Sequence, residues 1–149
     1  AQGRHAEALH LLGEALYVEV VGDGLSVSEI SKLLDQILQC LHETSSAVDG
    51  TRGAADTEPV QRSLNVLMED PRWHQLPETV DLAAMAHKAA LVHVAAGWLG
   101  TTPRRTAAAY NARAIRVLRE LAHEDHAPRW LAQAEAVQRA VLDERGGPP

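Results

Sequence analysis

At 149 residues the chain is long enough for one domain with a substantial core, and it is too short for two domains of ordinary size. Its formal net charge of −6 argues against a nucleic-acid-binding surface spread over the whole molecule, and 46% hydrophobic with 23% charged residues excludes disorder throughout. Aromatic residues make up only 3% and Phe is absent, so the core must be built from Leu, Val and Ala. That composition favours closely packed helices over a β-sandwich.

The cysteine content and the N-terminal residues indicate a cellular location and a longer parent protein. The lone Cys40 excludes an internal disulfide and a cysteine-based metal site, so we expect a reducing cytoplasm. Abundant Ala, with Arg in place of most Lys, is typical of a GC-rich bacterial genome. The sequence begins at Ala1 without Met and has no signal-peptide pattern, so we expect it to be part of a longer bacterial regulatory or scaffolding protein.

The first half of the chain predicts three helices. Apolar residues at helical spacing over residues 3–20 predict an amphipathic helix, which ends at the glycines after residue 21. Ser26 and Glu29 form an S-x-x-E capping box, which predicts a second helix over residues 26–41. Residues 44–58 are small and polar, predicting a long mobile loop. Pro59 then opens a short third helix that ends at Asp70-Pro71.

The second half is organised around the most apolar run, Pro77–Gly100. It is apolar on nearly every side, which predicts a buried central helix, and its charged residues and histidines argue against a membrane span. Residues 72–76 are predicted to be a linker. Thr102 and Pro103 are placed as N-cap and first residue of a fifth helix, and a sixth runs over residues 128–144.

These segments predict an all-α fold. We expect five or six antiparallel helices in a bundle around the Ala-rich helix 77–100, as a single domain over residues 1–145 with a disordered tail at 146–149. The third helix buries Val60, Leu64 and Leu67, and the fifth buries a stripe that includes Ala107, Tyr110 and Ala114.

Residues 3–16, GRHAEALHLLGEAL, carry small and large apolar residues at Gly3, Ala8, Leu12 and Ala15. In this pattern the segment resembles the second helix of a tetratricopeptide repeat. The resemblance covers about a tenth of the chain. It implies a helical repeat array that binds peptides or partner proteins, of which this chain would be the end, and it assigns no binding residues.

Motifs for metal binding are present but badly placed. Glu7 with His10, and Glu120 with His123, match the Glu-x-x-His pair of di-iron bundles, yet both pairs lie opposite the apolar stripe of their helix. The interhelical segment from His123 to His126 offers imidazole and carboxylate ligands without a further ligand or supporting residues. We therefore predict no metal and no cofactor.

Two groups of residues remain as candidate sites. His87 and His93 lie in the buried helix, about 120° apart on the helical wheel, and we place a candidate pocket near them with Trp73 and Trp98. Buried histidines satisfied within the core are the alternative interpretation. Thr102, Arg104 and Arg105 combine a helix N-terminus with guanidinium groups, which predicts an anion-binding site; exposed arginines paired with local carboxylates are the alternative.

No catalytic motif is found, so we predict a non-enzymatic protein–protein interaction or scaffolding module. The alternative function is a small-ligand-binding bundle or helical enzyme that uses the pocket near Trp73, His87 and Trp98. Self-association through surplus apolar faces, such as that of residues 30–41, is a third possibility. An interaction module should expose an apolar groove or edge helix, whereas a ligand binder should enclose a cavity.

Overall fold

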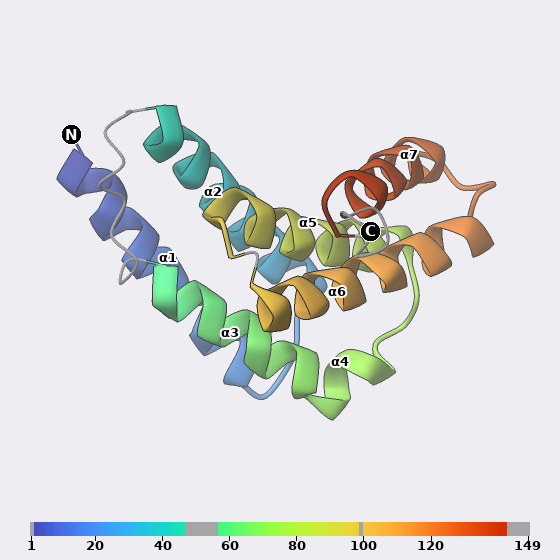
Figure 1. Cartoon of the computed structure of the whole chain (residues 1–149). Helices are drawn as coiled ribbons and strands as arrows, with labels where there is room; N and C mark the ends of the chain where they lie inside the picture. Colours follow the sequence, from blue (N-terminus) through green and yellow to red (C-terminus); the bar gives the residue numbers. More distant parts are fainter. Residues whose placement is uncertain (1, 47–56, 99, 143–149) are drawn as a thin grey trace. The chain divides into compact units, whose positions relative to one another are not determined.

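The computed structural model describes residues 2–46, 57–98 and 100–142, and these residues form seven α-helices and one π-helical turn (Figure 1). No β-strand occurs within these three ranges, so the prediction of an all-α fold is confirmed. Within them, no helix combines the length and apolar character needed to cross a membrane. Most of the predicted loop 44–58 and the whole predicted tail 146–149 lie outside the described residues.

The chain divides into two compact units, residues 1–75 and 76–149, and each is described by itself. The first holds α1 (Gln2–Val21), α2 (Val27–Ser46), α3 (Glu58–Glu69) and α4 (Pro71–Gln75). The second holds α5 (Val80–Ala96), α6 (Thr101–Glu120), α7 (Ala127–Val137) and the π-helical turn η2 (Gln138–Leu142). A single domain over residues 1–145 stays a prediction.

In the first unit, α1 packs against both α2 and α3 (Figure 1). Ser26 caps the start of α2, since its hydroxyl accepts a hydrogen bond from the Glu29 amide at 3.2 Å, while the Glu29 carboxylate lies 3.5 Å from Nζ of Lys32. The helix continues to Ser46, five residues beyond the predicted end at Leu41. The first three residues of the predicted loop 44–58 therefore belong to α2.

The prediction of a linker at residues 72–76 was wrong, because α4 occupies Pro71–Gln75. Asp70 ends α3, but its carboxylate Oδ1 also accepts a hydrogen bond from the Arg72 amide at 2.8 Å. An Asp followed by Pro can end one helix and begin the next, because Asp is a favoured N-cap and Pro fits the first helical position. Trp73 of this short helix is buried.

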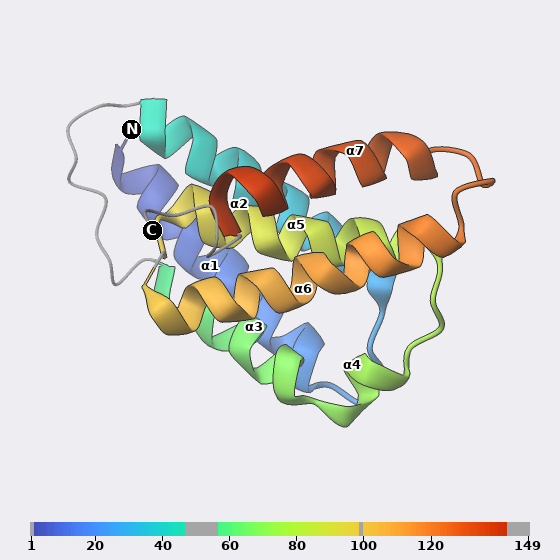
Figure 2. The same cartoon turned by 45° about the vertical axis from the view of Figure 1, so that its right-hand side comes forward.

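In the second unit, α5 contacts α6 and α7, while η2 contacts α6 (Figure 2). α5 is shorter than the predicted helix 77–100 at both ends. Thr79 is the N-cap, with its hydroxyl accepting from the Leu82 amide at 3.0 Å, and Gly97 ends the helix at a φ of 80°, a conformation that favours glycine. Its place at the centre of the whole chain stays a prediction.

The predicted start of α6 was also wrong by a few residues. Gly100 is the N-cap and the helix begins at Thr101, so Thr102 and Pro103 lie within the first turn. Pro is tolerated anywhere in that turn because its missing amide would have no helical partner there. The core of this unit includes Ala90, Ala107 and Leu142, with Val94, Ala108 and Val137 packed against them.

Candidate functional site

The most unusual surface in the described part of the chain is one face of α1. The large hydrophobic side chains that are exposed there are Leu11 at 61%, Val18 at 65% and Val21 at 48%, and no others are exposed to this degree among the described residues. Single exposed apolar residues are common on protein surfaces and need no explanation. α1 carries three of them, and no other element in the described ranges carries one. This distinguishes the exposed face of α1 from the rest of the described surface.

The exposed face of α1 follows a heptad pattern, in which positions a and d form the seam of a helix–helix contact. Glu7 and Glu14 are exposed at the neighbouring g positions, and Glu19 occupies an e position. Two heptads are too few for a long coiled coil and suit the docking of one short helix. We define the α1 seam as the residues at positions a and d: Ala8, Leu11, Ala15, Val18 and Gly22.

The other faces of α1 pack against α2 and α3, and the seam residues therefore stay on the exposed side of the helix. Leu9, Leu16 and Val20 are buried. A Cβ atom on Gly13 would lie 2.8 Å from Cβ of Pro59, so the two helices approach here as closely as a glycine permits. The Ser63 hydroxyl, which donates to the Pro59 carbonyl at 2.7 Å, lies 3.4 Å from the Gly13 carbonyl.

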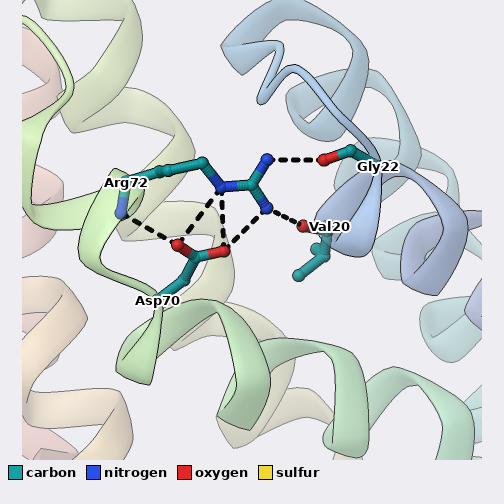
Figure 3. Close-up of polar contacts among 4 residues, drawn as sticks. All are labelled: Val20, Gly22, Asp70 and Arg72. Atoms are coloured by element: carbon teal, nitrogen blue, oxygen red, sulfur yellow. Dashed lines mark hydrogen bonds and ion pairs between the residues drawn. The ribbon is translucent and has the colours of Figure 1, made fainter.

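The C-terminal end of α1 is held by Arg72 of α4 (Figure 3). Its guanidinium donates hydrogen bonds to the backbone carbonyls of Val20, at 2.8 Å, and of Gly22. Carbonyls at the end of a helix lack helical donors, and a cation there also complements the helix dipole. The seam is therefore carried on a helix whose last turn is tied to another element.

Asp70 orients this guanidinium by a bidentate pair, with Nη2 to Oδ2 at 2.7 Å and Nε to Oδ1 at 3.2 Å. The hydrogen bond from the Arg72 side chain is the main cause that lowers the pKa of the Asp70 carboxyl. A planar fork of this kind restricts the arginine to one orientation, which is the orientation that reaches the α1 carbonyls.

A second group of polar residues lies inside the second unit, around His87 of α5. His87 and Asn111 of α6 are both buried, and Nδ1 of His87 lies 2.9 Å from Oδ1 of Asn111. The Asn111 amide nitrogen donates to the Ala134 carbonyl at 2.9 Å and to Oε1 of Gln138 at 3.0 Å. Because Oδ1 can only accept, the proton of His87 is on Nδ1. This network joins α5, α6, α7 and the start of η2.

His93 has a different environment. It is fully buried, and its Nδ1 lies 2.8 Å from the Ala89 carbonyl, which can only accept, so Nδ1 carries the proton. The other ring nitrogen, Nε2, is therefore an acceptor, and it is buried without a hydrogen-bond partner. Burial lowers the pKa of both His87 and His93, which favours the neutral imidazoles.

The predicted pocket residues are brought together only in part. The rings of His93 and Trp98 are 5.2 Å apart and perpendicular, because the turn at Gly97 folds Trp98 back over the helix end. The ring of His87 instead lies edge-on to Trp130, at 6.0 Å. Trp73 belongs to the first unit. A ligand pocket formed by these residues stays a prediction.

The residues of the predicted anion site at the start of α6 differ in exposure and in hydrogen bonding. Thr102 and Arg105 are exposed, while Arg104 is half-buried and its Nε has no hydrogen-bond partner. The Thr102 carbonyl accepts from the Thr106 hydroxyl at 3.2 Å. No acidic residue lies in the first turn of α6, so the positive end of the helix dipole has no local counter-charge within it. Anion binding here also stays a prediction.

In the described ranges, no three His, Cys, Asp or Glu side chains are grouped so that they could hold a metal ion. No family model matches the chain, and no curated protein or solved structure matches it either.

Sequence patterns did not identify the residues that organise these sites. Asn111 lies within the apolar stripe of α6, between Ala107 and Ala114, and a single polar residue in such a stripe signals a buried hydrogen-bond network. The sequence also contained an indication of the α1 seam, because Leu11 and Val18 lie beside Glu7 and Glu14 on the polar face of the helix. Nothing in the sequence pairs Arg72 with Val20.

Proposed function

We propose that the protein is a helical interaction module that binds another protein through the α1 seam. The exposed Leu11 and Val18 are the observation that carries this proposal. Covering a Leu or Val side chain fully is worth roughly 1.5–3 kcal/mol, and a partner helix laid along the seam would recover part of that free energy. Exposed apolar surfaces of this kind are typical of sites that bind another protein.

The fixed position of α1 supports the same proposal. A docking surface binds more tightly when it is already in its bound arrangement, because less conformational freedom is lost on binding. The close contact at Gly13 and the hydrogen bonds from Arg72 hold α1 at its middle and at its end. The seam is thus presented by a helix that is restrained on its other faces.

Site-specific cross-linking tests the proposal. A photo-reactive amino acid at position 18 should give a cross-linked protein adduct in cells of the source organism. The same group at position 36, on the exposed face of α2, is the matched control and should not give that adduct. Leu11→Ser should remove the adduct at position 18. Equal adducts at both positions, or an adduct at position 18 that survives Leu11→Ser, would contradict the proposal.

One observation favours the second candidate function, the binding of a small ligand in the second unit. Nε2 of His93 is a buried acceptor without a partner, beside the ring of Trp98. A ligand with an N–H or O–H group could satisfy it. Small phenols and amides, followed by the ¹⁵N resonance of His93 Nε2, test this function, and a resonance that none of them moves would count against it.

The expectations on family and location belong to the same proposal. The α1 segment that resembles a tetratricopeptide-repeat helix carries Ala8 and Ala15 on the seam, and in such arrays small residues let neighbouring helices approach closely. A bacterial cytoplasm fits the amino-acid usage and the single Cys40, which is buried.

A further inference from the structure

We propose that the partner of the α1 seam is an amphipathic helix of another protein, with an apolar stripe flanked by Lys or Arg. This inference rests on the proposed function and specifies the chemistry of the partner. The charges beside the seam, the charge of the first unit and the sizes of the seam residues all support it.

The charges beside the seam are acidic. Glu7 and Glu14 occupy two of the three g positions, with Val21 at the third, and Glu19 occupies one of the e positions. At these positions residues of paired helices meet across the interface and select the partner by charge. Glu14 has Arg62 at 3.8 Å and His10 at 4.0 Å, with all three side chains about half exposed. Such exposed pairs contribute little free energy, so Glu14 can exchange them for a cation on a partner.

The first unit as a whole has the same sign. Residues 1–75 carry twelve Asp and Glu against five Lys and Arg, whereas residues 76–149 carry eight against nine. The acidic excess of the chain therefore belongs to the unit that displays the seam. A field of this sign attracts cationic partners from a distance and repels nucleic acids and anionic membranes.

The seam residues also define the size of the partner. Positions a hold the small residues Ala8, Ala15 and Gly22, and positions d hold Leu11 and Val18. Small residues at a let a second helix approach closely and leave space for large side chains such as Leu on that helix. α1 ends at Val21, so its residues 8–21 span about 20 Å at 1.5 Å per residue, and a partner helix of about 15 residues covers the seam.

The same charges disfavour a second copy of this chain at the seam. Two α1 helices in antiparallel contact, with their seams overlapped, would place g positions beside g positions, and therefore Glu14 beside its counterpart and Glu7 beside Val21. In parallel contact, Glu14 would face Glu19 of the other copy. Like charges at these positions are used to prevent pairing, so the acidic seam selects against itself.

Two synthetic 21-residue helical peptides test the proposal. Both carry Leu at positions a and d; the basic peptide has Lys at e and g, and the acidic peptide has Glu there. Binding to the full chain is measured by titration calorimetry at 50 mM and 300 mM salt. Three variants are compared: L11S/V18S, which removes the seam; E7K/E14K, which reverses its charge; and D35K/E43K, which makes the same charge change at exposed positions of α2 outside its first turn.

We expect the basic peptide to bind and the acidic peptide not to bind. L11S/V18S should abolish binding, and E7K/E14K should weaken it at least ten-fold, while D35K/E43K should change it less than three-fold. Binding should weaken at 300 mM salt, because exposed charges are screened. All substituted residues are exposed, so unchanged circular dichroism and melting temperature show that a loss of binding is not a loss of fold.

Several results would overturn the proposal. Equal binding of both peptides, or an equal effect of E7K/E14K and D35K/E43K, would show that seam charge does not select the partner. If neither peptide binds but cross-linking from position 18 succeeds, the partner chemistry is wrong and the interaction function stands; if both fail, the interaction function fails too. A concentration-dependent dimer in ultracentrifugation that L11S/V18S abolishes would show that a second copy occupies the seam.

Discussion

Nη2 of Arg72 donates a hydrogen bond to the backbone carbonyl of Val20 at 2.8 Å, although the two residues are 52 positions apart in the chain (Figure 3). The contact joins the first turn of α4 to the last turn of α1. Val20 lies two residues after Val18 of the α1 seam. This hydrogen bond therefore restrains the C-terminal end of the seam.

Replacing Arg72 with Met should loosen the last turn of α1. The carbonyls of Val20 and Gly22 would lose their donors, and Asp70 would lose the cation that it holds. We expect a lower melting temperature and several-fold faster amide exchange over residues 18–22, measured by hydrogen exchange with mass spectrometry. Arg105→Met, at an exposed position of α6, is the control; if both variants exchange alike, the contact does not restrain α1.

Gly13→Ala should destabilise the first unit, although alanine is the better helix former by about 1 kcal/mol. The new Cβ would lie 2.8 Å from Cβ of Pro59 and 2.9 Å from the Val60 backbone nitrogen, and neither atom belongs to a flexible side-chain end. Overpacking of this kind costs about 1–3 kcal/mol, so we expect a net loss of up to about 2 kcal/mol in urea unfolding.

Gly24→Ala is the matched control for this substitution, because a Cβ there meets no atom within 4 Å. It should change the free energy of unfolding by less than about 0.5 kcal/mol. A Gly13→Ala protein as stable as the parent would mean that α1 and α3 can separate at this point without cost.

Local features were predicted well from the sequence where one short segment contains both partners of an interaction. Ser26 and Glu29 are three residues apart, and the hydrogen bond from the Glu29 amide to the Ser26 hydroxyl caps the start of α2. Asp70-Pro71 carries signals for both a helix end and a helix start, and only the first was recognised. The burial of His87 and His93 followed from the apolar surroundings of their helix.

The parts that could not be predicted depend on contacts distant in the sequence. The α1 helix has apolar residues on more than one face, and the close approach of Pro59 to Gly13 decides which of them α3 covers. The hydrogen-bond partners of His87 depend in the same way on where Asn111 lies in the packed unit. Periodicity indicates that a face is apolar, but it does not indicate whether a neighbour covers it.

Ala90→Leu should destabilise the second unit by about 1–3 kcal/mol, because Ala90 is fully buried and packs with Ala107 and Leu142. The added carbons would have to push α6 and η2 away from α5. Ala109→Leu, which adds the same atoms at an exposed position of α6, is the control and should change stability little. An unchanged free energy of urea unfolding for Ala90→Leu would show that this face of α5 can accept a larger side chain.

The stability of the protein should fall as the pH is lowered through the ordinary pKa of histidine, about 6.5. Burial lowers the pKa of His87 and His93 in the folded state, and Lys88 lowers that of His87 further. Below pH 6.5 the unfolded chain binds protons that the folded chain does not, so acid favours unfolding; each histidine contributes up to about 1.4 kcal/mol per pH unit until its folded-state pKa is reached.

Urea unfolding at pH 7.5 and 5.5 measures this loss of stability. His87→Gln, whose amide can still donate to Asn111, should reduce the loss.

His123→Gln is the control, because the His123 side chain is 75% exposed in the parent; it should leave the loss of stability unchanged. Equal stability at the two pH values would mean that both buried imidazoles can be protonated without opening the helices around them.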